Sequence, residues 1–393
     1  MLPSCEDLQL ENKRVFLRVD FNVPLDKEGK ISDDSRMKAS LPTIKYLMQK
    51  GAKLIVASHL GRPKGQVNPK FSLLPVAEHL AKLLDREVIF PDAGLGDGLR
   101  KLASELEPNQ LILLENLRFD PGEEANDVDF ARKLANLCDV YINDAFGTMH
   151  RSHASTVGML AFVQEKAAGF LVQKEVKFLS QLLNEPPRPF VAILGGAKVS
   201  DKIAVIENFL KKVDVLLIGG AMAYTFLAAQ GQRVGISLVE SDKFHQARKM
   251  LEKARVKGIP LVLPSDHVVA KSLDEASEKR TTLGQEITGE WMGVDIGPKT
   301  LEDFKNHLYG AKTIFWNGPV GAFEIPSFAR GSVQLAKMIS ESNAMSVIGG
   351  GDSLAAVKVA GVADKMTHLS TGGGASLEFL EGKKLPGLVA LES

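Results

Sequence analysis

The sequence predicts an α/β protein of two Rossmann-like lobes, each a parallel sheet flanked by helices, joined by a hinge helix. Three observations predict this fold. Short apolar runs alternate along the chain with longer segments of helical period. A proline-rich break at residues 185–189 divides the chain near its middle. The length of 393 residues is enough for two or three domains, at roughly 150 residues each.

The first half contains four short runs of branched apolar residues, which we expect to form parallel strands. They lie at residues 14–19, 53–57, 111–114 and 140–142. The segments 73–84 and 130–137 repeat apolar residues every three or four positions, as amphipathic helices do. In a sheet of this kind ligands bind beyond the carboxyl ends of the strands. The residues that directly follow each run are therefore the candidates for function.

Residues 169–184 are expected to form the helix that joins the lobes, because apolar side chains recur along one side of it. These side chains are Phe170, Leu171, Phe178, Leu179 and Leu182. Alternation resumes after the proline-rich break, with strands expected at residues 190–194, 215–218, 260–263, 313–316 and 345–348. The sequence thus predicts a first lobe over 1–168, an interdomain helix over 169–186 and a second lobe from residue 187.

Composition excludes several classes of protein. Lys plus Arg and Asp plus Glu both number 48, so the net charge is 48 − 48 = 0, and aromatic residues make up only 6%. A nucleic-acid binder usually has a basic excess and aromatic residues for stacking. No apolar run reaches the ~18 residues that a membrane helix needs. Two cysteines do not form a disulfide framework, which favours a reducing compartment and a cytoplasmic location.

Arginines recur just after the strands predicted in the first half. Arg62, Arg118 and Arg151 follow three of them, and Arg36 lies in the loop-rich stretch after the first. Guanidinium groups suit phosphate and carboxylate because each offers a planar fork of donors. His59 is a further donor beside Arg62. The sequence therefore predicts an anion site in the first lobe. The pair His150 and His153 lacks the further ligands that a metal site needs.

Glycine-rich turns mark the second lobe. Gly195 and Gly196 lead to Lys198 and Lys202, which would share a face if both lay on one helix. Glycines let a backbone approach phosphates closely, although the spacing does not fit a P-loop. Two further glycine turns lie at residues 349–353 and 371–376.

The turn at residues 349–353 also carries a carboxylate. Asp352 follows its strand directly, where it could bind Mg²⁺ together with phosphate oxygens. The sequence therefore predicts a nucleotide-phosphate site with a magnesium ligand in the second lobe.

Taken together, these segments resemble phosphoglycerate kinases of the bacterial type over essentially the whole chain. The resemblance begins with the run Arg18-Val19-Asp20-Phe21-Asn22-Val23-Pro24. Further matching blocks, in the order of the family, are residues 59–63, 114–119, 144–155, 195–202, 316–321, 349–353 and 372–376.

The resemblance implies a reversible reaction: 1,3-bisphosphoglycerate and ADP give 3-phosphoglycerate and ATP, with Mg²⁺, in glycolysis and gluconeogenesis. It implies direct in-line transfer after lobe closure. It also implies a monomer, and a tail over residues 375–393 that returns to the first lobe.

The same resemblance implies roles for individual residues. Those implied for 3-phosphoglycerate are Asp20, Asn22, Arg36, His59, Arg62, Arg118 and Arg151. Those implied for the nucleotide are Lys202, Gly293, Glu324, Gly350, Gly351, Asp352 and Ser353, with Asp352 also holding the metal. Those implied for the phosphoryl group in transfer are Arg36, Lys198, Gly372 and Gly373.

Two other readings remain open at this point. One is a different acid-acting kinase, such as an acetate or aspartate kinase, although a lone carboxylate would need fewer arginines. The other is a catalytically silent nucleotide-binding protein, although Lys198, Arg36 and Asp352 are all present.

Overall fold

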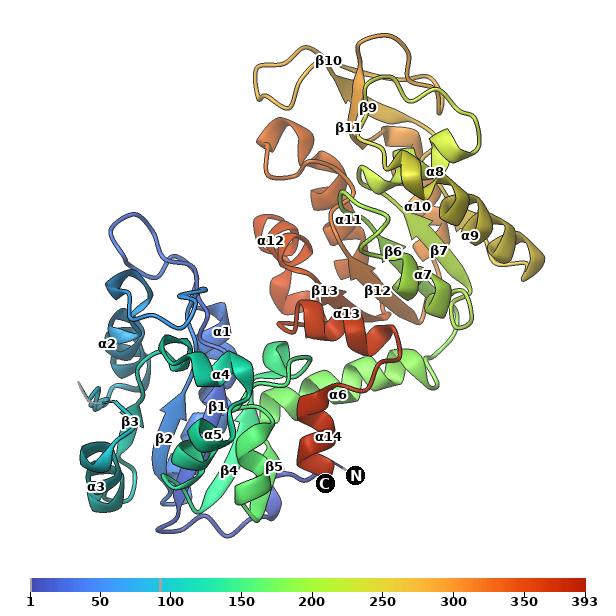
Figure 1. Cartoon of the computed structure of the whole chain (residues 1–393). Coiled ribbons are helices and arrows are strands. Elements are labelled where there is room, and N and C mark those ends of the chain that lie inside the picture. Colours follow the sequence, from blue (N-terminus) through green and yellow to red (C-terminus); the bar gives the residue numbers. More distant parts are fainter. Residues whose placement is uncertain (1, 92–93) are drawn as a thin grey trace. The chain divides into compact units, whose positions relative to one another are not determined.

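The computed structural model describes residues 2–91 and 94–393; residues 1, 92 and 93, which belong to the expected first lobe, lie outside the described part. The chain forms two compact units (Figure 1). Unit 1 comprises the chain up to Lys177 and again Lys384–Ser393, and unit 2 comprises Phe178–Lys383.

Unit 1 is built on a parallel sheet in the strand order β3-β2-β1-β4-β5. The strands are β1 (Arg14–Val19), β2 (Lys53–Ala57), β3 (Leu111–Leu113), β4 (Val140–Asp144) and β5 (Glu165–Ala168). β3 and β4 are buried along their whole length, and only the first residue of β1 and of β2 is half-buried. Burial on both faces explains why these strands are mostly apolar.

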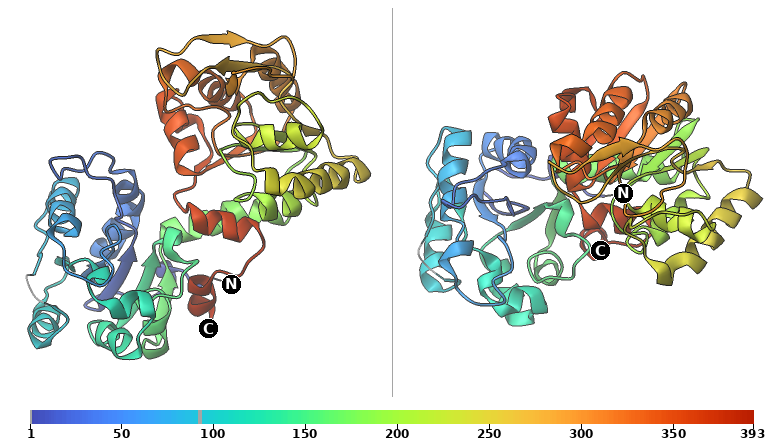
Figure 2. Two further views of the ribbon diagram at one scale, coloured as in Figure 1. Left: turned by 45° about the horizontal axis from the view of Figure 1, so that its top comes forward. Right: turned by 90° about the horizontal axis from the view of Figure 1, so that it is seen from above.

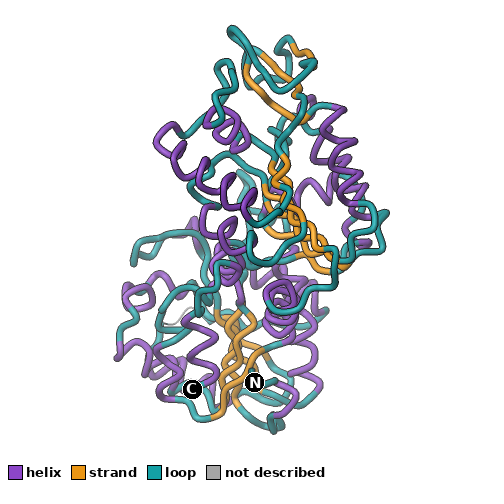
Figure 3. Tube along the Cα trace, turned by 90° about the vertical axis from the view of Figure 1, so that its right-hand side faces the viewer, coloured by secondary structure: helices purple, strands orange, loops and turns teal. Residues whose placement is uncertain are grey.

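Helices cover both faces of this sheet, as Figure 3 shows with the strands in orange. The helices of unit 1 are α1 (Ser35–Gln49), α2 (Leu74–Leu84), α3 (Asp97–Glu105), α4 (Pro121–Ala125), α5 (Val128–Ala135) and α14 (Pro386–Glu392). Single 3₁₀ turns complete it: η1 (Cys5–Asp7), η2 (Pro69–Phe71), η3 (Leu117–Phe119), η4 (Phe146–Thr148) and η5 (Gly158–Phe162). α4 begins where the Asp120 side chain accepts the Gly122 N–H at 2.8 Å, and Pro121 suits the first helical position.

Unit 2 contains a larger parallel sheet in the order β14-β13-β12-β6-β7-β8. Its strands are β6 (Phe190–Leu194), β7 (Val215–Ile218), β8 (Leu261–Val262), β12 (Thr313–Asn317), β13 (Met345–Gly349) and β14 (His368–Leu369). Its helices are α7 (Ile203–Phe209), α8 (Met222–Ala229), α9 (Phe244–Val256), α10 (Pro298–Leu308), α11 (Arg330–Ser340), α12 (Gly351–Val359) and α13 (Gly374–Leu380), with 3₁₀ turns η6 (Ser241–Lys243), η7 (Pro326–Phe328) and η8 (Ala363–Lys365). Trp316 of β12 and Phe304 of α10 are fully buried in its core.

The predicted parallel sheets are confirmed, and β1, β2, β6 and β7 have the predicted limits. β3 and β8 are shorter than expected, whereas β4, β12 and β13 extend one or two residues further. β5 and β14 were not predicted. β5 has four residues, of which the first two are Glu165 and Lys166, and β14 has only two residues, so neither forms an apolar run.

Unit 2 also contains a three-stranded antiparallel sheet that the sequence did not predict. Its order is β10-β9-β11, formed by β9 (His267–Ala270), β10 (Lys279–Thr281) and β11 (Met292–Ile296). β10 is exposed along its length and carries Lys279 and Arg280, so neither an apolar run nor an alternation marks it as a strand.

Helix α6 (Phe170–Leu183) confirms the helix predicted at residues 169–184. Val172, Glu175, Leu179 and Leu182 are buried at intervals of three or four residues. The boundary between the units falls within this helix, between residues 177 and 178, whereas the expected limits were at residues 168 and 186.

The chain returns to unit 1 at Lys384 rather than at residue 375. α13 belongs to unit 2, where the Asn208 Nδ2 donates to the Leu380 carbonyl at 2.6 Å. α14 belongs to unit 1, lies beside β5 (Figure 2), and the Gly387 N–H donates to the Met149 carbonyl at 2.9 Å. The returning segment is therefore shorter than expected.

Candidate active site

The carboxyl edge of the unit 1 sheet carries a cluster of guanidinium groups around His59, which directly follows β2 and is buried. Burial lowers the pKa of His59 well below its usual value, and the positive charges of Arg18, Arg118, Arg36 and Arg151 lower it further. The imidazole is therefore neutral at neutral pH. The structure thus brings together three of the arginines that the sequence predicted, and adds Arg18, which it did not.

Arg36 lies in the first turn of α1, not in a loop as the sequence suggested. Its Nη1 donates to Asp20 Oδ2 at 2.8 Å, and Asp20 directly follows β1. The Arg36 side chain is 36% exposed, so it remains partly accessible to a ligand. The carboxylate fixes one edge of the guanidinium group and leaves the other for a ligand.

Asn22 and Arg118 hold the loop after β2 through Gly61. Asn22 Oδ1 accepts the Gly61 N–H at 2.9 Å, and Arg118 Nη1 donates to the Gly61 carbonyl at 2.8 Å. Gly61 has φ +62, and a Cβ there would lie 2.5 Å from the Phe71 ring, so only glycine fits. Burial lowers the pKa of Arg118 to about 10, which leaves it charged at neutral pH.

The remaining predicted residues of this site differ in how firmly they are held. Arg62 is exposed on the same loop as Gly61. Arg151 is half-buried, and its Nε lies 3.3 Å from His150 Nε2. Arg62 and Arg151 are thus less buried than His59 and Arg118, which suits them to meet an anion that enters from solvent.

A buried network below the cluster was missed by the sequence analysis. Arg18 Nε donates to Ser155 Oγ at 2.8 Å, and Ser155 Oγ donates to Glu123 Oε1 at 2.5 Å. All three side chains are at most 1% exposed. Arg18 gave one usable signal: a charged residue inside an otherwise apolar strand needs a buried counter-ion. Nothing local to Glu123 or Ser155 in the sequence identifies them as its partners.

In unit 2, Lys198 and Lys202 do not share a helix face, which corrects the sequence interpretation. Both precede α7, which begins at Ile203. Lys198 is exposed, whereas Lys202 is 8% exposed and donates to the carbonyl oxygen and Oδ1 of Asn317. Burial lowers the pKa of Lys202 to about 8, against the opposing charges of Asp201 and Asp352.

The turn that carries Lys198 is packed tightly against the loop after β12. The Gly195 N–H donates to the Asn317 carbonyl at 2.9 Å, and the Gly196 N–H to the Pro319 carbonyl at 2.8 Å. A Cβ on Gly195 would overlap the carbonyl oxygens of Pro319 and Gly318. The glycine at this position is therefore required by the close approach of two backbones.

The turn after β13 lies beside the same asparagine. Gly350 has φ +89, and a Cβ there would lie 3.2 Å from Asn317 Nδ2. The Ser353 hydroxyl accepts the Gly318 N–H at 2.6 Å, so it holds the neighbouring loop. Gly351 and Asp352, in the first turn of α12, are exposed. Lys202, Asn317 and the 350–353 turn thus form one polar cluster at the carboxyl edge of this sheet.

The other predicted residues of unit 2 lie on adjoining segments. Gly372 and Gly373 follow β14, and Gly373 has φ +52 at the start of α13. Gly293 lies on β11, where a side chain would overlap the Tyr224 ring. Glu324 is exposed on the loop after β12. The same loop is bound to β11, because the Ala322 N–H donates to the Val294 carbonyl at 2.7 Å.

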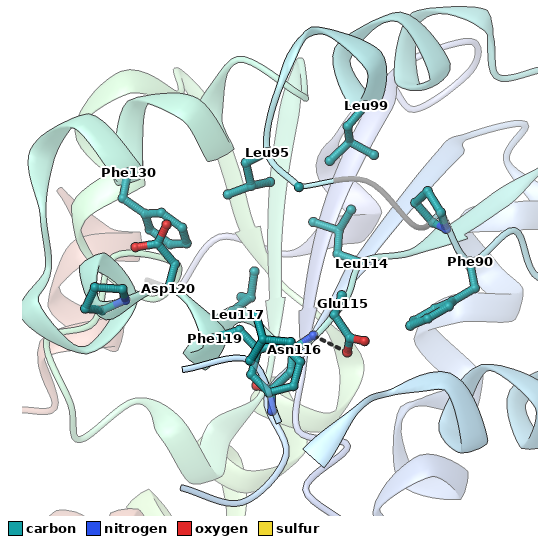
Figure 4. A pocket seen from close by; sticks show the side chains of 14 residues that line it. Phe90, Leu95, Leu99, Leu114, Glu115, Asn116, Leu117, Phe119, Asp120 and Phe130 are labelled. Carbon is teal, nitrogen blue, oxygen red and sulfur yellow. Dashed lines mark hydrogen bonds between the residues drawn. The ribbon is translucent and has the colours of Figure 1, made fainter. Parts of the chain in front are cut away.

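A cavity of about 420 Å³ lies beside the segment that carries Arg118, but it is not the anion site (Figure 4). Most of its described lining is apolar, including Leu99, Leu114 and Phe130. In its wall the Glu115 carboxylate accepts from the Ser72 hydroxyl at 2.7 Å and from two backbone N–H groups. No lysine or arginine is among the described residues that line it, so it cannot neutralise a phosphate.

A resident metal site is not found in the described part of the chain: no three His, Cys, Asp or Glu side chains there are grouped to hold an ion. Asp352 offers an exposed carboxylate in the 350–353 turn, where its charge acts on Lys202. A single carboxylate fits Mg²⁺ that arrives with a nucleotide, because this ion takes most of its other ligands from phosphates and water. No helix of the described residues is long and apolar enough to cross a membrane.

An arginine cluster at one sheet edge and a glycine and lysine edge on a second sheet are the features of a two-lobed α/β phosphotransferase. The family model for phosphoglycerate kinase matches residues 5–383. The chain belongs to the phosphoglycerate kinase family, and is thus a glycolytic phosphotransferase with a carboxyl group as acceptor.

Relatives and solved structures agree with this assignment. The phosphoglycerate kinase of Anaeromyxobacter sp. (strain Fw109-5) is 55% identical over 393 residues, which cover 100% of this chain and 99% of that protein. That of Acidobacterium capsulatum is 56% identical over 398 residues, covering 99% and 98%. The structure of the phosphoglycerate kinase from Coxiella burnetii matches with a TM-score of 0.90 at 43% identity, covering 100% of this chain and 99% of that one.

Proposed function

We propose that unit 1 binds 3-phosphoglycerate or 1,3-bisphosphoglycerate, that unit 2 binds MgATP or MgADP, and that the phosphoryl group passes directly between them. The observation that carries this proposal is the convergence of Arg36, Arg118 and Arg151 on the neutral His59 at one sheet edge. A substrate with both a phosphate and a carboxylate needs several such donors, whereas a simple carboxylate does not. The two proposed domains correspond to units 1 and 2. A monomer and a cytoplasmic location are further parts of the proposal.

The roles of the residues follow from their positions. Asp20, Asn22, Arg36, His59, Arg62, Arg118 and Arg151 are assigned to the acid substrate. Lys202, Gly293, Glu324, Gly350, Gly351, Asp352 and Ser353 are assigned to the nucleotide, and the Ser353 hydroxyl also holds the neighbouring loop by accepting the Gly318 N–H. Arg36, Lys198, Gly372 and Gly373 are assigned to the group in transfer.

The chemistry explains why the site needs no general base. In the direction of ATP consumption, a carboxylate oxygen attacks the γ-phosphorus, and the bond from that phosphorus to the β–γ bridging oxygen breaks as ADP leaves. The nucleophile is already ionised at neutral pH, so no proton is moved. The residues therefore act by positioning and by neutralising charge on a loose in-line transition state. Lobe closure, which excludes water, is part of the proposal.

Asp352 is proposed to hold Mg²⁺ bound to the nucleotide, which supplies charge neutralisation on the phosphates when present. Asp352→Asn should therefore abolish most of the difference in affinity between MgADP and metal-free ADP, a loss of about tenfold or more. Calorimetry with and without Mg²⁺ measures this difference. Asp364→Asn, an exposed aspartate of the same unit, is the matched control. An unchanged Mg²⁺ effect in Asp352→Asn would show that another group holds the ion.

Lys202 predicts a pH dependence of nucleotide binding. Its pKa of about 8 means that the free protein loses this charge as the pH rises through 8. The dissociation constant of MgADP should therefore increase by up to about tenfold between pH 7 and pH 9. Lys202→Met should bind more weakly at pH 7 and lack this dependence. The same slope in Lys202→Met would rule out Lys202 as its origin.

The function itself is tested by a coupled assay with MgATP and 3-phosphoglycerate, run beside acetate. We expect turnover with 3-phosphoglycerate and none with acetate. Equal turnover of acetate would favour the general acid-acting kinase, and binding of MgADP without turnover would favour the silent nucleotide-binding protein.

A further inference from the structure

Arg18 is a buried arginine whose donors are all directed inward. It lies on β1, is 1% exposed, and donates from Nη1 to the Val19 carbonyl and from Nε to Ser155 Oγ. Its Nη2 lies 3.3 Å from Nδ1 of His59. Arg18 therefore cannot turn toward a ligand at the sheet edge without breaking these contacts. Its one link to the anion site is the His59 ring.

A second chain of contacts fixes Arg18 from the opposite side. Glu123 on α4 is fully buried, and its two carboxylate oxygens accept the Ser155 hydroxyl at 2.5 Å and the Ser155 N–H at 2.9 Å. Glu123 Oε1 also lies 4.0 Å from Arg18 Nη2. The charges of Arg18 and Glu123 balance, which a buried ion pair requires. A carboxylate, a hydroxyl, a guanidinium group and an imidazole thus form one continuous chain.

The chain determines which nitrogen of His59 carries a proton. A guanidinium group has only donors, so Nδ1 of His59 must act as the acceptor and cannot be protonated. The neutral ring then carries its hydrogen on Nε2. Burial and the surrounding arginines disfavour a second proton.

We propose that Arg18, held in place by Ser155 and Glu123, fixes His59 as the neutral Nε2–H tautomer and so makes it a donor of constant direction for the anionic substrate. Arg18, Ser155 and Glu123 are positioning residues in this arrangement, and His59 alone of the four touches the ligand. The functional part of the inference rests on the proposed binding of 3-phosphoglycerate at this edge.

In this arrangement the arginines supply the positive charge of the substrate site, and His59 supplies a hydrogen bond of fixed direction. Arg36, Arg118 and Arg151 supply positive charge around the ring, and Asp20 offsets part of it. The nearby His153 is also neutral, because burial and the charges of Arg118, Arg18 and Arg151 lower its pKa to about 4. A neutral His59 adds a hydrogen bond without a further charge, so its contribution stays constant through the physiological pH range.

Nitrogen-15 NMR of the full-length protein labelled at histidine tests the tautomer without any ligand. We expect Nδ1 of His59 at the shift of a bare ring nitrogen and Nε2 at that of a protonated one. Neither should titrate between pH 6 and pH 8. A His59 that carries its proton on Nδ1, or that titrates within this range, would overturn the proposal whatever the substrate is.

Two variants test the positioning. Ser155→Ala removes the link between Glu123 and Arg18, and Arg18→Met combined with Glu123→Gln removes both charges together, so no unpaired charge is left buried. In each, a signal from Nδ1–H should appear. In the double variant the pKa of His59 should rise, because the Arg18 charge no longer lowers it. KM for 3-phosphoglycerate should increase about tenfold, as expected for one lost charged-site hydrogen bond.

Arg14→Gln is the matched control, because Arg14 lies on the same strand and pairs with Asp139 at 2.6 Å, away from His59. It should leave the tautomer and KM unchanged. If the tautomer is lost in the variants while KM stays the same, the fixed tautomer does not serve substrate binding, and that half of the inference fails. His59→Gln then shows whether the tautomer or His59 itself is irrelevant to binding. An unchanged KM in His59→Gln would show that the proposed role of His59 in substrate binding is wrong.

Discussion

Arg36→Ala is expected to lower kcat for the phosphorylation of 3-phosphoglycerate by about 10²–10³-fold, while the affinity for MgADP barely changes. Arg36 donates from Nη1 to Asp20 Oδ2 at 2.8 Å, and its side chain is 36% exposed. Its charge is available to oxygens that gain negative charge in the transition state. Because Arg36 belongs to unit 1, the nucleotide edge of unit 2 should not be affected. Steady-state kinetics and calorimetric titration with MgADP measure the two quantities.

Lys38→Ala provides the control for this substitution. Lys38 lies two residues further on the same helix, is exposed, and pairs with Asp34 at 3.0 Å rather than with the site. Its loss should leave kcat within about twofold, as for most surface substitutions. If Arg36→Ala instead abolishes MgADP binding, Arg36 has been assigned to the wrong unit.

Lys198→Ala is expected to cause a loss of similar size in kcat, about 10²–10³-fold, with binding of 3-phosphoglycerate unchanged. Lys198 is exposed on a turn whose backbone is fixed by the hydrogen bonds of Gly195 and Gly196 to the loop after β12. A flexible ammonium group on a fixed turn can follow the phosphoryl group during transfer. Equilibrium binding of 3-phosphoglycerate and single-turnover kinetics with MgATP separate binding from chemistry.

Lys211→Ala is the control, because it removes an exposed lysine of the same unit that follows α7. It should behave as the unsubstituted protein. A Lys198→Ala protein with normal kcat but a raised KM for MgATP would mean that Lys198 binds the ground state only.

Much of the fold could be predicted because its strands are buried on both faces. β6 and β7 are uninterrupted apolar runs, and β1 and β2 are apolar apart from Arg14, Arg18 and Lys53, so their limits are visible in the sequence. β10 is exposed and charged, and β14 has only two residues. Their pairing depends on neighbours that sequence patterns do not reveal.

The arginine cluster around His59 could be predicted because parallel strands bring their carboxyl ends to one edge. Arg118 and His59 therefore meet although their positions differ by 59 residues. The buried network of Arg18, Ser155 and Glu123 could not be predicted in this way. Ser155 binds Glu123 and Arg18, which lie 32 and 137 residues away in the sequence. Gly293 and Glu324 came only from the family resemblance, since neither follows a pattern with a chemical meaning of its own.

The lysines of unit 2 show the limit of spacing arguments. Lys198 and Lys202 are four residues apart, but α7 begins only at Ile203. Gly195 and Gly196 keep the segment before it in a turn because two backbones meet there. Spacing predicts a shared face only where the helix itself is certain.

Hydrogen–deuterium exchange with each ligand alone tests most directly whether each unit binds one of the two substrates. We predict that 3-phosphoglycerate slows exchange at residues 20–23, 59–62 and 116–119, and that MgADP slows it at residues 195–202 and 349–353. Protection of the unit 2 segments by 3-phosphoglycerate alone, with none at the arginine cluster, would contradict the assignment of 3-phosphoglycerate to unit 1 and of the nucleotide to unit 2.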